Sequence, residues 1–155
     1  MGILKNKNGI AYIYVCIITL FIAALLSVVV LYMGLISQVQ IQKRDIQKKL
    51  DSYMAEYATE AFNAIKQGES YEVHIDYYEL QQGVFPTFGF TSPNMSEYHY
   101  ANGNCTITRP VITVLRGNGF GLTARYNAIF PIRWNGKAFS SLTIPVTVSS
   151  YFKFK

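Results

Sequence analysis

Few residues in this sequence could supply an active site, which needs a nucleophile with a base, a carboxylate pair or a metal cluster. Asp76 and Glu79 lie three positions apart in a segment that alternates like a β-strand, so their side chains should point to opposite faces. His74 falls on the polar face of the same segment, and His99 falls between two tyrosines in a predicted loop. We expect both histidines to be exposed or simply hydrogen-bonded, and the protein not to be an enzyme.

The cysteines and the glycine cluster do not predict a cofactor or metal site. Cys16 lies in a long apolar run and Cys105 in a predicted strand, so we expect no intrachain disulfide, and Cys105 should be a small core side chain. With the two histidines, the cysteines show no paired spacing typical of zinc ligands. The glycine-rich run from Gly117 to Gly121 lacks the lysine and the following helix of a phosphate-binding loop, and predicts a turn.

The elements that carry these residues must fit into 155 residues, about one ordinary domain. Half of the residues are hydrophobic and only 15% are charged, with a net charge of +5, which argues against intrinsic disorder. The chain is therefore expected to be folded or embedded in a membrane.

Residues 10–36 contain no charge and no proline and predict a transmembrane helix. At 1.5 Å per residue the run reaches roughly 40 Å, more than the hydrocarbon thickness of about 30 Å. The run is too long for the apolar core of an ordinary cleaved signal peptide. The hydroxyl of Thr19 can return to a carbonyl of the preceding turn. We expect residues 1–9 to form a basic leader before this span.

The count of basic residues alone favours a cytoplasmic C-terminal side, because more basic residues follow the span than precede it. Lys5 and Lys7 come before, and four come after: Lys43, Arg44, Lys48 and Lys49. A short basic head before a long apolar run is nevertheless the layout of a signal-anchor. On that layout, and because the second half is rich in Tyr and Thr, we expect a single-pass protein of the cell membrane with its C-terminal domain extracytoplasmic.

Residues 37–67 predict an amphipathic extension of the same helix, ended by Gly68. The apolar stripe is Val39, Ile46, Leu50, Tyr53, Tyr57, Ala61 and Ile65. It should pack on the C-terminal domain of the same chain, and a coiled-coil partner is the alternative. Asp45 and Lys49 have the favourable i to i+4 order of an ion pair.

Residues 68–155 predict an antiparallel β domain, so the fold class is α+β with the long helix packed on the sheet. Strands are expected at 71–78, 105–108, 111–115, 120–134 and 138–154, with a long surface loop and a short strand or two over 81–102. Asn135-Gly136 predicts a tight hairpin. Pro131 and Pro145 each remove a ladder donor, so an edge or a bulge is expected at both.

The basic residues of the second half are spaced singly, at Arg109, Arg116, Arg125, Arg133, Lys137, Lys153 and Lys155. A basic face with aromatic residues between could bind nucleic acid or complement an acidic neighbour. Because the cations are isolated and the domain is tethered to a membrane, we do not expect a nucleic-acid partner.

The N-terminus resembles a type IV prepilin leader, which is short, basic and ends in Gly before an apolar helix. Here the leader would end at Gly9, and the following Ile10-Ala11-Tyr12-Ile13 looks most like the TadE-like pseudopilins of tight-adherence systems and their Gram-positive relatives. The resemblance implies cleavage between Gly9 and Ile10 by a prepilin peptidase, other pilin-like subunits or further copies of the chain as partners, and a cell-surface filament.

One position departs from the family, in which an acidic residue five positions after the cut is thought to pair with a neighbour's new amine. Here that position is Tyr14, which favours a minor, tip or initiating subunit, or an uncleaved anchor. In an assembly, small residues would let helices approach closely. These are Ala11, Ala23, Ala24 and Gly34. The expected function is a minor structural subunit of an adherence, secretion or DNA-transfer apparatus, and the alternative is a membrane-anchored binding module.

Overall fold

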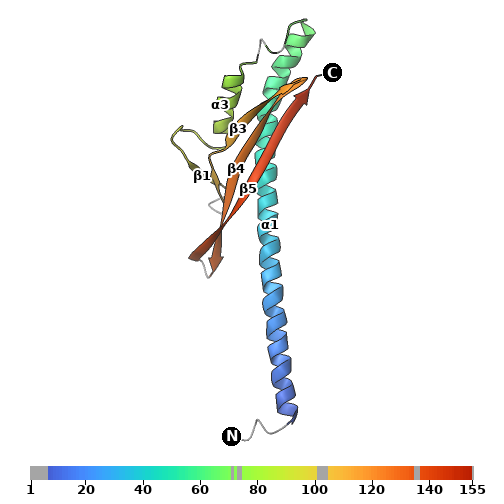
Figure 1. Cartoon of the computed structure of the whole chain (residues 1–155), viewed down its shortest axis with the longest axis vertical. Coiled ribbons are helices and arrows are strands. Elements are labelled where there is room, and N and C mark those ends of the chain that lie inside the picture. Colours follow the sequence, from blue (N-terminus) through green and yellow to red (C-terminus); the bar gives the residue numbers. More distant parts are fainter. Residues whose placement is uncertain (1–6, 71, 73–74, 101–104, 135–136, 155) are drawn as a thin grey trace. The chain divides into compact units, whose positions relative to one another are not determined.

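The computed structural model describes residues 7–70, 72, 75–100, 105–134 and 137–154, and it confirms an α+β protein with a long N-terminal helix and an antiparallel sheet (Figure 1). The elements are α1 (Lys7–Lys66), α3 (Tyr77–Thr87), β1 (Glu97–Tyr100), β2 (Cys105–Thr108), β3 (Val111–Gly117), β4 (Gly119–Trp134) and β5 (Lys137–Lys153). The chain divides into two compact units, unit 1 over residues 1–38 and unit 2 over residues 39–155, and each is described by itself.

Unit 1 is helical over all of its described residues, 7–38. The helix predicted for residues 10–36 is confirmed, and it begins at Lys7, three residues earlier than expected. Nothing in this stretch interrupts the backbone hydrogen bonds, because it contains no proline and its glycines are isolated. The second predicted helical segment, 37–67, is confirmed as the rest of α1, which ends at Lys66.

Unit 2 is built around β4, which pairs with a neighbour along both edges. β5 pairs with β4 along its length, from Gly119–Lys153 to Trp134–Lys137. On the opposite edge β3 pairs with residues 119–125 of β4 and β2 with residues 128–129, and β1 then pairs with β2. All of these pairings are antiparallel. The strands predicted at 105–108, 111–115, 120–134 and 138–154 are thereby confirmed.

Both strand prolines lie where a missing N–H is tolerated. The backbone N–H of Asn127 donates to Thr108 Oγ1, so Asn127 faces away from β5. Its register partner Pro145 therefore turns its donor-free nitrogen to the outer edge of β5, which pairs with no other described strand. Pro131 is followed at once by a register shift between Ile132 and Arg133. The predicted turn at 135–136 lies outside the described residues.

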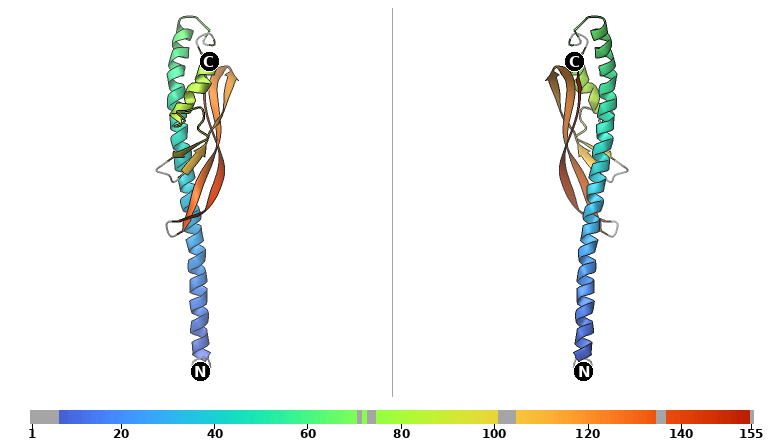
Figure 2. Two further views of the ribbon diagram at one scale, coloured as in Figure 1. Left: turned by 90° about the vertical axis from the view of Figure 1, so that its left-hand side faces the viewer. Right: turned by 90° about the vertical axis from the view of Figure 1, so that its right-hand side faces the viewer.

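The sheet buries one face against the helices of unit 2 (Figure 2). Even-numbered residues of β4, such as Leu122 and Phe130, are fully buried, as is Val148 of β5. Odd-numbered residues, such as Arg125 and Thr147, are exposed on the other face. Period-2 alternation of this kind is what an antiparallel sheet with one covered face requires.

Helix α1 presents a buried stripe to this sheet, and the stripe differs in part from the predicted one. The buried residues are Gln42, Ile46, Leu50, Met54, Ala61 and Ala64. Ile46, Leu50 and Ala61 are confirmed, whereas Val39, Tyr53 and Tyr57 are half-buried and Ile65 is exposed. Met54 is fully buried in the stripe, whereas the hydroxyl of its neighbour Tyr53 donates to the carbonyl of Leu80 in α3 at 3.1 Å.

The strand predicted at 71–78 is wrong in its described part. Asp76 is the N-cap of α3, and its carboxylate accepts hydrogen bonds from the backbone N–H of Tyr78 at 2.8 Å and of Glu79 at 3.2 Å. A side chain that satisfies two free helix donors favours helix over strand at this point. His74, with residues 71 and 73, lies outside the described residues.

The loop predicted at 81–102 is also corrected. Its first part is α3, whose Leu80 and Val84 are buried, and Phe88 and Phe90 after the helix are buried as well. The helix lies beside β3, where the side-chain amide of Gln81 donates to the carbonyl of Ile112 at 2.9 Å (Figure 1). Residues 91–96 are an irregular and largely exposed segment, and the short strand expected in this region is β1, so this part of the prediction is confirmed. Residues 101–102 lie outside the described residues.

Candidate functional site

The apolar helix of unit 1 is long and apolar enough to cross a membrane, with a mean hydropathy of 2.9 over its most apolar window and none of that window buried. Leu20 and Phe21 are 72% and 65% exposed. The hydroxyl of Thr19 donates to the carbonyls of Val15 and Cys16 at 2.9 Å, as predicted, so this polar group needs no partner outside the helix. Exposed apolar side chains such as Leu20 and Phe21 are stable only when lipid or another protein surface covers them.

The residues singled out for processing and assembly all lie on this helix. Gly9 and Ile10 are in its first turns, and Tyr14 is 64% exposed. The position five residues after the predicted cut is therefore an exposed tyrosine in place of a carboxylate.

The four small residues do not form one site. They are all exposed, and a Cβ added at Gly34 would meet no atom within 4 Å. At 3.6 residues per turn Ala23 and Gly34 share one side of the helix, whereas Ala11 and Ala24 lie on other sides. Ala23 and Gly34 are thus the pair best placed for close helix approach.

The residues considered for catalysis have structural roles where they are described. Asp76 caps α3, and the ring Nδ1 of His99 lies 2.9 Å from Thr106 Oγ1. Cys105 is a buried core residue as predicted, and burial raises the pKa of its thiol. Within the described ranges no three His, Cys, Asp or Glu side chains are grouped to hold a metal ion.

A polar hollow of about 270 Å³ lies between α1 and α3 and was not expected from the sequence. It is lined by Tyr53, Glu56, Tyr57, Glu60 and Glu79. The hydroxyls of Tyr53 and Tyr57 are 3.3 Å apart. Burial, then the bond to Tyr57, raises the pKa of Tyr53 well above its ordinary value, so this phenol stays protonated. The capping pattern Asp76-x-x-Glu79 could have revealed α3, and with it the position of Glu79.

An apolar groove of about 640 Å³ lies between α1 and the C-terminal end of β5, along the same stretch of α1 as the polar hollow but on another face of the helix. It is lined by Ala55, Ala58, Thr59, Phe62, Ile65, Phe152, Lys153 and Phe154. Phe62 is 52% exposed, and Lys66 Nζ lies 4.7 Å from the centre of its ring. The groove adds to the apolar surface that the chain exposes, because its aromatic rings are only partly covered.

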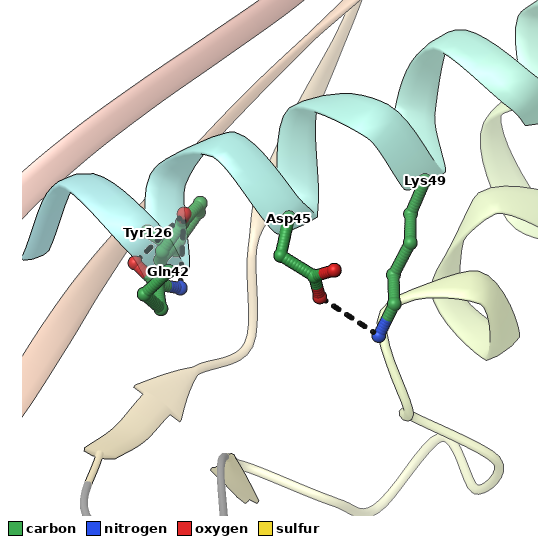
Figure 3. Close-up of polar contacts among 4 residues, drawn as sticks. All are labelled: Gln42, Asp45, Lys49 and Tyr126. Carbon is green, nitrogen blue, oxygen red and sulfur yellow. Dashed lines mark hydrogen bonds and ion pairs between the residues drawn. The ribbon is translucent and has the colours of Figure 1, made fainter. Parts of the chain in front are cut away.

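Gln42 and Tyr126 form a buried polar contact between α1 and the sheet within unit 2 (Figure 3). The Gln42 amide Nε2 lies 3.1 Å from the Tyr126 hydroxyl, and that hydroxyl lies 3.3 Å from the Gln42 carbonyl oxygen. Gln42 is 3% exposed and Tyr126 is 6% exposed, so a one-turn shift of the helix would leave both groups buried without a partner. The pair therefore fixes the position of residue 42 along the sheet.

Ionisation of Tyr126 should destabilise unit 2 at alkaline pH. Burial raises the pKa of Tyr126 to about 12, partly offset by the Gln42 hydrogen bond, whereas an unfolded Tyr has a pKa of about 10. The free energy of unfolding is then retained below pH 10 and falls as the pH rises from about 10 to about 12. We expect Tyr126→Phe to show a smaller fall in this range, measured by urea unfolding of the full chain in detergent. The exposed control Tyr151→Phe should behave as wild type, and an undiminished fall in Tyr126→Phe would contradict the assignment.

Comparison of the chain with protein families, with characterised proteins and with solved structures gave no match.

Proposed function

We propose that this protein is a minor pilin-like structural subunit of a bacterial adherence, secretion or DNA-transfer apparatus, anchored in the cell membrane by the first half of α1. The observation that supports this most is a helix whose first half is apolar, with no residue buried in its most apolar window, and whose second half packs on an antiparallel sheet. A water-filled environment cannot accommodate that first half, so lipid or neighbouring helices must cover it. The extracytoplasmic position of the sheet is part of the proposal.

In the proposed mechanism the apolar helix leaves the bilayer and joins the apolar helices of other subunits. Lipid tails are as apolar as the side chains of such a bundle, so the exchange depends on close packing rather than on the hydrophobic effect. Ala23 and Gly34, on one side of the helix, would allow that approach. The sheet would supply the contacts outside the membrane, and no cofactor takes part.

Removal of the leader tests this proposal. In a host that carries a prepilin peptidase, the mature chain should begin at Ile10, because Gly9 is the residue after which such an enzyme would cut. Intact-mass measurement of the purified chain should show the loss of Met1 to Gly9 in the wild type. In Gly9→Val the full-length mass should persist.

The matched control is Gly2→Val, which places the same substitution in the leader away from the cut and should still be processed. If the wild type keeps Met1 to Gly9 in a host shown to process another prepilin, the pilin-like proposal is wrong.

The second candidate is a single-pass anchored binding module that keeps its leader. Tyr14 favours it, because an exposed phenol at this position cannot form an ion pair with a neighbour's amine. An unprocessed chain that remains in the membrane would support this second candidate.

A further inference from the structure

The part of α1 that belongs to unit 2 separates an acidic surface from a basic and apolar one. The polar hollow contains Glu56 and Glu60 of α1 and Glu79 of α3. The apolar groove contains Phe62 of α1 and Lys153 of β5. At 3.6 residues per turn, the α1 residues that line the hollow and those that line the groove point to nearly opposite sides of the helix. A contact that covers one surface therefore leaves the other free for a second contact.

The three carboxylates give the hollow a negative potential. All three are exposed, and within the described residues none of them lies within ion-pair distance of a lysine or arginine. Burial and then the hydrogen bond to Tyr57 raise the pKa of Tyr53, and the negative charges of Glu79 and Glu56 raise it further. A cation that entered the hollow would therefore be attracted by charges that the described fold leaves unpaired.

The hollow has room for the ammonium group of a lysine. Its volume of about 270 Å³ equals that of roughly nine water molecules, at about 30 Å³ each in the liquid. A lysine side chain is a compact charge on a flexible stem, and its ammonium group only donates hydrogen bonds. The carboxylates and the phenol oxygen of Tyr57 can accept these bonds. The hollow is therefore suited to a lysine that comes from another molecule.

The groove side presents such a lysine next to exposed apolar surface. Lys153 is exposed where it lines the groove. Lys66 adds a second cation, with its Nζ 4.7 Å from the centre of the ring of Phe62, and Phe62 is 52% exposed. The acidic side also has an exposed aromatic residue, because Tyr78, which precedes Glu79 in α3, is 73% exposed. Each surface therefore combines charge with apolar area, and the two charges have opposite signs.

A second copy of the chain is a partner that has both complements. Lys153 of one copy can enter the hollow of the next, while Tyr78 of that next copy covers aromatic surface of the groove. Because the two surfaces differ, the contact is heterologous, and each copy can use its groove toward one neighbour and its hollow toward another. Opposite charges across a contact of this kind select the partner and fix its orientation.

We infer that copies of this protein associate side by side, with Lys153 and the groove of one copy against the hollow and Tyr78 of the next. A standard protein–protein interface has about 20 to 30 residues a side, and the two surfaces have fewer, so a single contact is weak and depends strongly on its charges. By naming a second copy as the partner the inference rests on the structural role in the proposed function, but not on leader cleavage.

Sedimentation velocity of the full chain in detergent micelles at low ionic strength tests the inference. The wild type should form oligomers that grow beyond pairs as its concentration rises, and added salt should reverse this growth. Lys153→Glu places like charges across the contact, and Glu56→Gln with Glu60→Gln removes most of the charge of the hollow. Each variant should raise the dissociation constant roughly tenfold or more, at unchanged far-ultraviolet circular dichroism.

A mixture of the two variants distinguishes a heterologous contact from a symmetric one. Lys153→Glu keeps an intact hollow, and Glu56→Gln with Glu60→Gln keeps an intact groove, so one wild-type contact can form between them. Association should therefore return in the equimolar mixture and stop at pairs. A mixture that remains monomeric, or that grows as far as the wild type, would overturn the inference.

Cross-linking identifies the residues in contact. A carbodiimide joins a lysine amine to a carboxylate that lies against it, and a mixture of ¹⁵N-labelled and unlabelled copies separates contacts between copies from contacts within one. Peptides that link Lys153 of one isotope to Glu56, Glu60 or Glu79 of the other should be found by mass spectrometry. Links to Lys153 that are confined to one isotope would contradict the proposed contact.

The matched controls carry the same kinds of substitution away from both surfaces. Arg125→Glu reverses an exposed charge on the sheet, and Glu97→Gln removes an exposed carboxylate from β1. Both should associate as the wild type does. An equal loss in these controls would overturn the inference, as would growth that persists in both test variants, because the apolar helix would then hold the copies together. Leader processing is measured separately, so either proposal can fail alone.

Discussion

Three arginines placed in the middle of the apolar helix should release the protein from the membrane. Leu20→Arg, Ala24→Arg and Val28→Arg fall at spacings of four, on one side and near the centre of residues 10–36. Each arginine at the centre of a span costs about 2.5 to 3.5 kcal/mol of insertion free energy, so the three together cost roughly 10 kcal/mol. Because these side chains are exposed in unit 1, their replacement removes no contact of the fold. After alkaline carbonate extraction the variant should be in the soluble or aggregated fraction.

The control replaces the same positions with apolar residues, as Leu20→Val, Ala24→Leu and Val28→Leu, and should stay in the extracted membranes. A triple arginine variant that is retained as well as wild type would show that the apolar helix is not what holds the protein there. The anchoring half of the proposed function would then be wrong, whatever the result of the cleavage experiment.

Truncation of Phe120 should cost unit 2 a large part of its stability. The ring is fully buried, and its centre lies 6.1 Å from that of Phe152 and 5.8 Å from that of Phe154. Phe120→Ala removes buried apolar surface and leaves a cavity, which together cost about 3 to 5 kcal/mol. Domains of this size have only about 5 to 15 kcal/mol of unfolding free energy. The urea midpoint of the full chain in detergent, followed by circular dichroism, should fall markedly.

A substitution on the opposite face of the sheet provides the comparison. Thr147 is exposed on β5, so Thr147→Ala should change the free energy of unfolding by no more than about 0.5 kcal/mol. If Phe120→Ala and Thr147→Ala have the same midpoint, the even-numbered face of β4 is not the core of unit 2.

The parts of the fold that follow from local pattern were predictable. Residues 10–36 form a helix because their apolar run has no breaker, and β4 and β5 pair because their alternation flanks a two-residue connection. Helix α3 was missed because Tyr71, Val73 and Ile75 alternate with the polar residues Glu72, His74 and Asp76 just before it, and this alternation is typical of a strand. Its stability comes from the Asp76 cap and from burial of Leu80 and Val84, which depend on the rest of unit 2.

Some residues of the candidate sites could likewise be predicted from local sequence, and others could not. Gly9, Tyr14 and Gly34 can be named from local sequence alone, and the structure adds only that Tyr14 and Gly34 are exposed on the helix of unit 1. The pairing of Gln42 could not be named, because its partner Tyr126 is 84 residues away and a glutamine after a membrane span suggests a solvated face. The hollow around Tyr53 was missed for the same reason, since its residues come from α1 and α3.

The outer edge of β5 has a consequence for how copies of this protein can meet. An unprotected edge strand of 17 residues can pair with the backbone of a second copy, and such pairing is a route to aggregation. Pro145 leaves a gap in the row of donors on that edge, and the side chain of Gln47 already occupies the carbonyl of Ser149 at 2.9 Å. If copies lie side by side in one bilayer, as the proposed function requires, backbone pairing between their sheets is interrupted at Pro145 and Ser149, so contact between their helices does not bring with it a continuous sheet.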